Sequence, residues 1–458
     1  MAHAALLRFL GGSLLAVLLP ALGVSSAGAR SDQGRTIEEM GGILDFRERV
    51  EPINRMLRDR LENLLPRLMR EAGIDLWLVI NREYMEDPVY LTLVPEPVFS
   101  ARRTTMLVLF DRGPEEGVER LTVSRYPLEG FYEAAWEGGS LAEQWERLAE
   151  VVAERDPKRI GINTSRGWAF GDGLSAGLHE QLLEALGREL RRRVVSAEEL
   201  TIRWLETRTP LELEAYPSIV ALARGVIAEA FSSQVITPGV TTTEDVRWYI
   251  RQRFEDLNLR PWFQPYVNIQ RRERVHERDE DFFGEKGVIR RGDVLHTDVG
   301  ICYLRLCTDT QEMGYVLALG EEQPPAGLRR ALAEGNRWQD LLTGEYVTGR
   351  TGNEILAATR AAAEREGIDS KVYTHPIGFY GHAAGPTIGM WDNQGPTPVR
   401  GEWKLYPDTA YAIEGNIKAK VPEWDDQWVQ IKLEQSAIFD GEKVLYLAGR
   451  QTRWHLVR

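Results

Sequence analysis

Hydrophobic positions follow a helical period near the start of the chain and a strand-like pattern soon afterwards. In residues 38–75, Leu and Met recur at helical intervals, which predicts a helix. Apolar runs of strand length follow: IDLWLVI, TTMLVLF, VERLTVSRY and KRIGINTS. Helical patterns accompany them, notably LAEQWERLAEVVAER and GLHEQLLEALGREL. Strands that alternate with helices predict a smaller N-terminal α/β domain over residues 38–205.

The pattern changes near residue 206, where charged residues and Pro210 mark a domain boundary. An amphipathic helix is expected from Glu212 to Val235, and residues 241–244 form a capping-box pattern before another helix. Strands and turns are expected to dominate from there to the C-terminus. We therefore predict an α+β protein with a second domain over residues 206–458.

Residues 1–29 differ in composition from the rest of the chain. Arg8 is followed by a short uncharged run that Gly and Pro interrupt, and the run ends in Ala27, Gly28 and Ala29. These features are typical of a secretory signal peptide. We therefore expect export, either to the periplasm or as a secreted protein. An uncleaved membrane anchor is the alternative.

The chain has 458 residues and a net charge of −13, which argues against nucleic-acid binding because that function needs a basic surface. Its two cysteines are Cys302 and Cys307. In an oxidising compartment they could pair if the chain reverses near Leu304. The alternative, which we favour from the sequence, is that both are small buried apolar side chains.

Two aspartates bracket the same segment, which reads DVGICYLRLCTD. Asp is depleted in strands, yet Asp298 and Asp309 both lie in strand-like patterns. If these strands pair, the two carboxylates converge, and a proton or a cation must relieve their repulsion. The pair therefore allows two hypotheses, an acid–base dyad or a metal site.

Three further polar residues lie among small or apolar residues downstream. His382 lies between glycines and alanines in THPIGFYGHAAGPTIG, Glu414 ends an apolar strand pattern and Glu434 lies within another. A buried carboxylate is costly unless it is paired or bound to a metal. Four carboxylates and one imidazole would suit two divalent metal ions, with Mn²⁺ favoured and Zn²⁺ or Co²⁺ as alternatives.

This order of residues resembles that of the M24 metallopeptidases of the pita-bread fold, a family of Xaa-Pro aminopeptidases, prolidases and methionine aminopeptidases. The resemblance covers residues 206–458 and implies a pita-bread catalytic domain. The preceding domain is similar to that of the proline-specific and creatinase-like members, and methionine aminopeptidases lack it. Creatinases lack the metal-binding residues, so the complete set argues against creatinase chemistry.

The resemblance also implies a role for each residue. Asp298 would chelate one ion, and Asp309 and Glu434 would bridge both. His382 and Glu414 would hold the other ion. A water or hydroxide between the ions would attack the peptide bond, and Glu414 would pass its proton to the leaving amine. The implied protein is an exported dinuclear peptidase that cleaves N-terminal peptide bonds, with Xaa-Pro as the expected substrate and a homodimer as the usual assembly.

One residue of the family pattern is absent. Family members usually carry a second His seven residues after the ligand His, and that position is Gly389. His375, seven residues before His382, could act in its place or could be a turn residue beside Pro376. His276 lies where the family places a substrate-binding His, and an exposed, idle side chain is the alternative.

Four other residues complete the sequence-based expectations. His296 is expected to be a hydrogen-bonded residue of the core, Trp391 and Tyr380 could line a substrate pocket, and Glu312 is expected to be structural. The missing second His also keeps two alternative functions open. One is a related metallohydrolase of non-prolyl amides or esters, and the other is a metal-binding pseudo-peptidase without catalysis.

Overall fold

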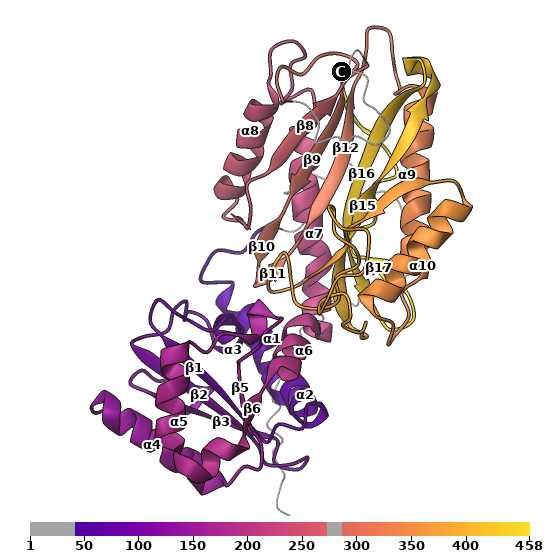
Figure 1. Cartoon of the computed structure of the whole chain (residues 1–458). Coiled ribbons are helices and arrows are strands. Elements are labelled where there is room, and N and C mark those ends of the chain that lie inside the picture. Colours follow the sequence, from indigo (N-terminus) through magenta and orange to yellow (C-terminus); the bar gives the residue numbers. More distant parts are fainter. Residues whose placement is uncertain (1–41, 273–285) are drawn as a thin grey trace, which may run out of the picture. The chain divides into compact units, whose positions relative to one another are not determined.

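The computed structural model describes residues 42–272 and 286–458 (Figure 1). The expected signal peptide (residues 1–29) and His276 lie outside the described residues, so both stay predictions. Within the two described ranges, no helix combines the length and the apolar character that crossing a bilayer requires.

The N-terminal part of the described chain is a six-stranded sheet with helices on both faces. Its strands are β1 (Leu76–Arg82), β2 (Thr104–Asp111), β3 (Val118–Ser124), β4 (Glu133–Ala134), β5 (Ile160–Ile162) and β6 (Val194–Ser196), in the order β4-β3-β2-β1-β5-β6. Its α-helices are α1 (Val50–Asp59), α2 (Leu65–Glu71), α3 (Tyr90–Leu93), α4 (Leu141–Arg155), α5 (Ala176–Leu190) and α6 (Glu198–Glu206). A π-helical turn, Arg60–Leu64, joins α1 to α2.

Alternation along β1 explains the two helical layers. Leu78 belongs to a core that includes residues of α4 and α5, whereas Trp77 and Val79 belong to a core that includes residues of α2 and α6. Successive side chains of a strand point to opposite faces, so a strand buried on both sides needs helices on both sides. This is the α/β arrangement that the sequence predicts, although the boundary near residue 206 stays a prediction.

The C-terminal part holds a nine-stranded sheet whose main order is β13-β15-β16-β12-β9-β8. Those strands are β8 (Tyr266–Gln270), β9 (Val294–Val299), β12 (Thr310–Val316), β13 (Asp369–Val372), β15 (Thr409–Val421) and β16 (Gln427–Phe439). Three short strands add to it, because β14 (His375–Ile377) pairs with β15, β17 (Val444–Tyr446) with β16 and β18 (His455–Val457) with β12. A separate small sheet contains β7 (Arg260–Pro261), β10 (Ile301–Tyr303) and β11 (Leu306–Cys307).

Two pairs of helices cover this sheet (Figure 1). Helices α7 (Pro210–Ala230) and α8 (Thr243–Asp256) share one hydrophobic core with β8 and β9. Helices α9 (Ala326–Gly344) and α10 (Gly352–Arg365) share another core with β15 and β16. The fold class is therefore α+β, as predicted.

Strands and turns dominate the chain after α8, as expected, but helices α9 and α10 lie among them and were not predicted. Their buried faces include small or polar residues such as Gly335, Asn336 and Ala362. The start of α10 does carry a signal, since Thr351 and Glu354 form a capping box.

Two helix boundaries also differ from those expected. Helix α7 ends at Ala230 rather than Val235. The capping box of α8 lies one residue later than expected, because the Thr242 hydroxyl accepts from the backbone N–H of Asp245. The second difference lies within the usual uncertainty of helix ends, whereas α7 ends five residues earlier than expected.

A disulfide closes the hairpin between the two aspartates. Cys302 on β10 pairs in register with Cys307 on β11, and a disulfide joins them with 4.0 Å between their Cα atoms. The chain reverses at Leu304 and Arg305, whose φ angles of +50° and +65° lie in the left-handed region. The interpretation that we favoured, two buried thiols, is therefore wrong, because the turn brings the two side chains face to face.

Candidate metal centre

Strand pairing lines up most of the carboxylates on one face of the sheet. Asp298 on β9 lies opposite Gln311 on β12, Gln311 lies opposite Glu434 on β16, and Glu434 lies opposite Glu414 on β15. Directly paired residues of antiparallel strands point to the same face. Asp309 immediately precedes β12, and its carboxylate can share one ion with those of Asp298 and Glu434.

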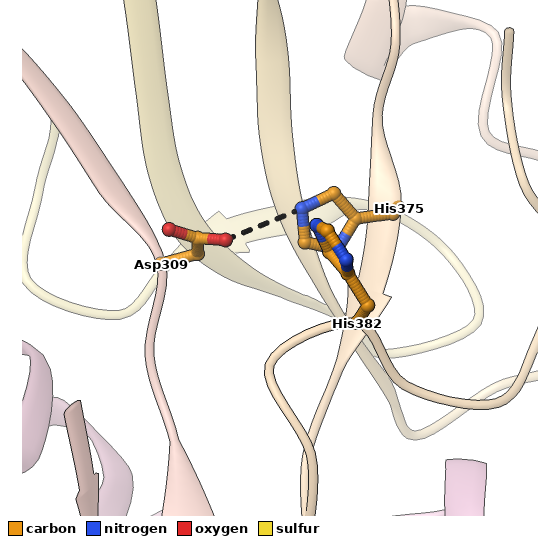
Figure 2. A group of neighbouring side chains, drawn as sticks. All are labelled: Asp309, His375 and His382. Carbon is orange, nitrogen blue, oxygen red and sulfur yellow. Dashed lines mark ion pairs between the residues drawn. The ribbon is translucent and has the colours of Figure 1, made fainter. Parts of the chain in front are cut away.

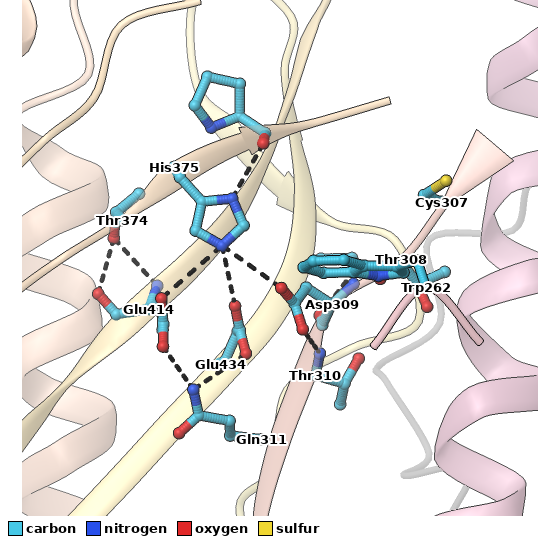
Figure 3. A network of polar contacts seen from close by, with 12 residues as sticks. Trp262, Cys307, Thr308, Asp309, Thr310, Gln311, Thr374, His375, Glu414 and Glu434 are labelled. Atoms are coloured by element: carbon cyan, nitrogen blue, oxygen red, sulfur yellow. Dashed lines mark hydrogen bonds and ion pairs between the residues drawn. The ribbon is translucent and has the colours of Figure 1, made fainter. Parts of the chain in front are cut away.

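His375 lies in the middle of this carboxylate cluster (Figure 3). Its Nε2 atom is 3.4 Å from Asp309 Oδ2, 3.4 Å from Glu434 Oε1 and 3.7 Å from Glu414 Oε2. Its Nδ1 atom is 2.9 Å from the carbonyl oxygen of Pro376, so Nδ1–H is the donor of that bond and Nε2 faces the carboxylates. The pairing of β14 with β15 explains this direction, because His375 lies opposite Ala412, two residues before Glu414.

His382 reaches the cluster from the loop that follows β14. Its ring packs edge to face with that of His375, with 4.5 Å between ring centroids (Figure 2). The indole of Trp262 lies on another side of it, at a centroid distance of 5.0 Å. Among the carboxylates of the cluster, only Asp309 forms a candidate ligand group with His382 in the described ranges.

The cluster holds more negative charge than its surroundings can stabilise. Burial raises the pKa of Asp298 to about 7 and that of Glu414 to about 8. Burial and the neighbouring carboxylates raise the pKa values of Asp309 and Glu434 well above their usual range. Burial alone would lower the pKa of His375, but Glu434 and Glu414 raise it to about 9. All five groups therefore favour an added positive charge.

The donor atoms fit divalent cations. Three of them, Asp298 Oδ1, His375 Nε2 and Glu434 Oε1, are buried without a hydrogen-bond partner. An unpaired buried polar atom is costly, so a ligand that satisfies all three is favoured. Three candidate ligand groups overlap among the described residues, with ligand atoms of each group within 4.8 Å of one another: Asp309, His375 and His382; His375, Glu414 and Glu434; and Asp298, Asp309 and Glu434.

Residues 216–438 match the sequence model of metallopeptidase family M24. The chain carries an M24 metallopeptidase domain. A comparison with curated proteins finds no match. The M24 domain makes the chain a hydrolase of the metallopeptidase class, as the sequence analysis expects.

Solved structures show the same fold. An X-Pro aminopeptidase from Thermotoga maritima MSB8 has 17% identity and a TM-score of 0.61, over 85% of this chain and 100% of that one. A Xaa-Pro dipeptidase from Bacillus anthracis has 18% identity and a TM-score of 0.54, over 90% and 100%. A prolidase from Pyrococcus furiosus has 15% identity and a TM-score of 0.51, over 84% and 99%. The expected pita-bread fold with a preceding α/β domain is confirmed.

A cavity of about 540 Å³ opens onto the carboxylate cluster of the M24 domain. Its lining includes Tyr266, Lys371, Met390, Trp391 and Arg400. Trp391 therefore lines a pocket, as expected. Volumes of this size suit small ligands.

Tyr380 does not line this cavity, which contradicts the sequence-based expectation. Its hydroxyl donates to the carbonyl oxygen of Pro88 at 2.5 Å, and its ring lies 4.7 Å from that of Phe170. Tyr380 follows the apolar residue Phe379 in a loop that packs against residues of the N-terminal part. Its role in the M24 domain is to anchor the loop between the two histidines.

Gly389, where the sequence analysis sought a second His, has no room for a side chain. Its φ angle is +72°, and a Cβ atom would lie 2.2 Å from the carbonyl oxygen of Val372. Steric conflict with the backbone therefore excludes His at this position. The spacing of seven residues that the family pattern requires is instead present between His375 and His382.

Two residues near the cluster escaped the sequence analysis. Gln311 donates to Glu414 Oε1 at 2.5 Å and to Glu434 Oε2 at 3.1 Å. Trp262 donates to the carbonyl oxygen of Thr308 at 2.9 Å. Neither is ionisable, so neither stands out in a search for charged residues. One signal for Gln311 was available. It lies two residues after Asp309, and side chains two residues apart in a strand point to the same face.

His296 and Glu312 have the roles that the sequence suggested. His296 is buried, with Nε2 2.8 Å from Gln311 Oε1, and burial lowers its pKa to about 3. Glu312 lies away from the cluster, with a carboxylate oxygen 2.6 Å from Arg224 and another 2.5 Å from His455. Although burial raises the pKa of Glu312, these two partners lower it to about 2.

Proposed function

We propose that this protein is a dinuclear metallopeptidase that hydrolyses the peptide bond after the first residue of a short peptide, with Xaa-Pro bonds as the expected substrate. The observation that carries the proposal is the position of His375 Nε2, which lies within 3.7 Å of three carboxylates at the base of a cavity. Asp298, Asp309, Glu414 and Glu434 are the other proposed ligands. The M24 domain and the named structural neighbours support the reaction class.

His375, rather than His382, is the proposed metal ligand. Its Nε2 atom approaches Asp309, Glu414 and Glu434, whereas His382 shares a ligand group with only one of these carboxylates. His382 then occupies the place of the second His, seven residues later. This exchange of roles removes the doubt that the absent second His raised, because a His then lies seven residues after the proposed ligand.

The residues of this chain supply proton transfer and orientation. Bound divalent cations, Mn²⁺ as first choice and Zn²⁺ or Co²⁺ as alternatives, would supply Lewis acidity and a water that is acidic enough to react at neutral pH. Glu414 takes a proton from the attacking water and gives it to the leaving amine. His382, held between His375 and Trp262, faces the cavity and orients the substrate carbonyl. His276 keeps its expected role in substrate binding.

The lining of the cavity supports a short peptide with an apolar side chain. Tyr266, Met390 and Trp391 offer apolar surface for a proline ring, and Lys371 and Arg400 add positive charge beside it. Proline has no amide hydrogen and adopts few backbone conformations, so a dedicated peptidase is useful. The similar solved structures include an X-Pro aminopeptidase and a Xaa-Pro dipeptidase, which supports the same choice.

Export and dimer formation are further parts of the proposal. The signal-like composition of residues 1–29 supports export, and the Cys302–Cys307 disulfide is consistent with an oxidising compartment. We therefore place the protein in the periplasm or outside the cell. A homodimer is proposed because similar proteins usually form one.

The test is to incubate the purified protein with Mn²⁺, Zn²⁺ or Co²⁺ and with Xaa-Pro, Xaa-Ala and N-blocked peptides, and to identify the fragments by mass spectrometry. Release of the first residue from Xaa-Pro peptides is expected. Glu414→Gln should lower kcat by about 10²–10⁴-fold, whereas Glu312→Gln, a buried carboxylate outside the cluster, should retain turnover. Faster cleavage of non-prolyl or blocked substrates would favour the related hydrolase, and metal binding without any cleavage would favour the pseudo-peptidase.

A further inference from the structure

Gln311 occupies a central place in the row of paired residues. It lies on β12 between Asp298 on β9 and Glu434 on β16. Its side-chain amide donates to Glu414 Oε1 at 2.5 Å and to Glu434 Oε2 at 3.1 Å. Gln311 is 4% exposed, although it borders the cavity. One neutral side chain therefore holds two carboxylates that come from different strands.

The hydrogen bonds also fix the orientation of the amide. A glutamine amide has two N–H donors and one carbonyl acceptor. Both donors are used by the glutamates, so the oxygen Oε1 is the atom that faces His296, whose Nε2 lies 2.8 Å away. The imidazole must therefore donate from Nε2. His296 is 4% exposed and holds the amide in this single orientation.

The two glutamates consequently present one specific oxygen each to the cavity side. Gln311 holds Glu414 Oε1 and Glu434 Oε2, whereas the opposite oxygens, Glu414 Oε2 and Glu434 Oε1, face His375 Nε2 at 3.7 and 3.4 Å (Figure 3). Without Gln311 both carboxylates could rotate, because the second oxygen of each would lose this donor.

We propose that Gln311 is a positioning residue for the cation site, and that His296 sets the orientation of its amide. The pair arranges Glu414 and Glu434 before a cation arrives, so the entropy of ordering two carboxylates is lost on folding and not on binding. The inference rests on the cation binding of the proposed function, but it does not depend on peptide cleavage.

Gln451 provides a matched control. It is a fully buried glutamine that accepts from the backbone N–H of Met313 and donates to its carbonyl oxygen, on the same strand as Gln311. In the described ranges its hydrogen bonds join it to Met313, Asn336 and Arg453, and none joins it to the carboxylates. A change in Gln451 therefore reports the general effect of losing a buried amide next to β12.

The experiment measures Mn²⁺ affinity by calorimetry, and the visible absorption of bound Co²⁺ as a readout independent of activity. Gln311→Ala should weaken Mn²⁺ binding by about 10–100-fold and change the Co²⁺ spectrum. Gln451→Ala should leave the Mn²⁺ affinity and the Co²⁺ spectrum unchanged, even if it lowers the melting temperature. His296→Leu should weaken Mn²⁺ binding. His296→Gln should weaken it less, because the glutamine side chain supplies a donor. In the Gln311→Ala background neither change at His296 should weaken Mn²⁺ binding further.

The outcomes separate the two proposals. Wild-type affinity and an unchanged Co²⁺ spectrum in folded Gln311→Ala, with circular dichroism as the check of folding, would overturn this inference alone. Equal losses in Gln311→Ala and Gln451→Ala would also overturn it, because the effect would then be general destabilisation. A wild-type protein that binds neither Mn²⁺ nor Co²⁺ would overturn the proposed function together with this inference.

Discussion

His375 and His382 pack edge to face, with ring centroids 4.5 Å apart and ring planes at 86°. The loop between them is held from outside, because Cys307 N–H donates to the carbonyl oxygen of Gly378 at 2.7 Å and the Trp262 indole packs against His382. The two histidines therefore form one packed pair whose members face different surroundings. His375 faces carboxylates, whereas His382 faces the cavity and an indole ring.

This difference predicts unequal effects of removing the two rings. His375→Ala should remove most of the bound metal and lower activity in parallel. His382→Ala should leave the metal content close to that of the wild type and lower kcat or raise KM. Elemental analysis of the dialysed proteins, together with kinetics on an Xaa-Pro peptide, checks both expectations. The reverse pattern, with metal lost only in His382→Ala, would restore His382 as the ligand.

The cation-free protein should lose stability as the pH rises. The folded pKa values of Asp298 and Glu414, about 7 and about 8, lie above the unfolded values of about 4. The unfolded chain therefore releases these protons first, and stability falls between about pH 4 and pH 8, by up to about 1.4 kcal/mol per pH unit and group. Protonated His375 also adds stability, because its folded pKa of about 9 lies above the unfolded value of 6.5. This contribution is fully present below the unfolded pKa and is lost as the pH rises to the folded pKa of about 9.

Urea unfolding in a chelator at several pH values measures this slope. Saturating Mn²⁺ should reduce or reverse it, because the ion binds the deprotonated ligands. Glu434→Gln, which removes one charge from the cluster, should flatten the slope in the chelator. The control is Glu312→Gln. The pKa of Glu312 is about 2, so its carboxylate does not titrate in the folded state between pH 5 and 8. A flat wild-type profile would contradict the charge balance described for the cluster.

The disulfide should stabilise both the hairpin and the histidine loop. Cys302→Ser/Cys307→Ser should lower the free energy of unfolding by about 2 kcal/mol, the amount expected for a loop this short. Because Cys307 contacts the backbone of Gly378 and Phe379, the double variant should also weaken Mn²⁺ binding. Peptide mapping with and without reductant establishes the bond. Full retention of stability and metal affinity would mean that the cross-link has no effect on the site.

Gly389 should not tolerate even a methyl group. Gly389→Ala places a Cβ atom 2.2 Å from the Val372 carbonyl oxygen in a residue with φ of +72°. A loss of about 2–5 kcal/mol is expected. Gly349 is the matched control, since its φ is +87° and nothing lies within 4 Å of its Cβ position. Gly349→Ala should cost only the backbone strain, about 1–2 kcal/mol. Equal thermal shifts in the two variants would refute the steric argument.

The sequence pattern was sufficient to select the four carboxylates as candidates, because charge within an apolar strand is expensive. Asp298, Asp309, Glu414 and Glu434 all interrupt such patterns, and all four lie in the candidate ligand groups. The sequence pattern did not indicate which of the two histidines is the better candidate for a metal ligand. The choice depends on the pairing of the three-residue strand β14 with β15, which no local pattern announces.

Other features depended on contacts that sequence patterns do not encode. The disulfide requires a turn with positive φ at Leu304 and Arg305, residue types that do not signal such a turn. Gln311 is neutral, and its importance comes from neighbours on three other strands. Helices α9 and α10 were missed because Gly, Ala and amide side chains form much of their buried faces.

The pairing of Glu434 with both Gln311 and Glu414 has a consequence for the order of events during synthesis. The ribosome makes Asp298, on β9, long before it makes Glu434, on β16. The two carboxylates come together only when β16 enters the sheet between β12 and β15. A nascent polypeptide that ends before this strand lacks Glu434, which belongs to two of the three candidate ligand groups. The complete set of proposed ligands can therefore assemble only after β16 has been made and has joined the sheet.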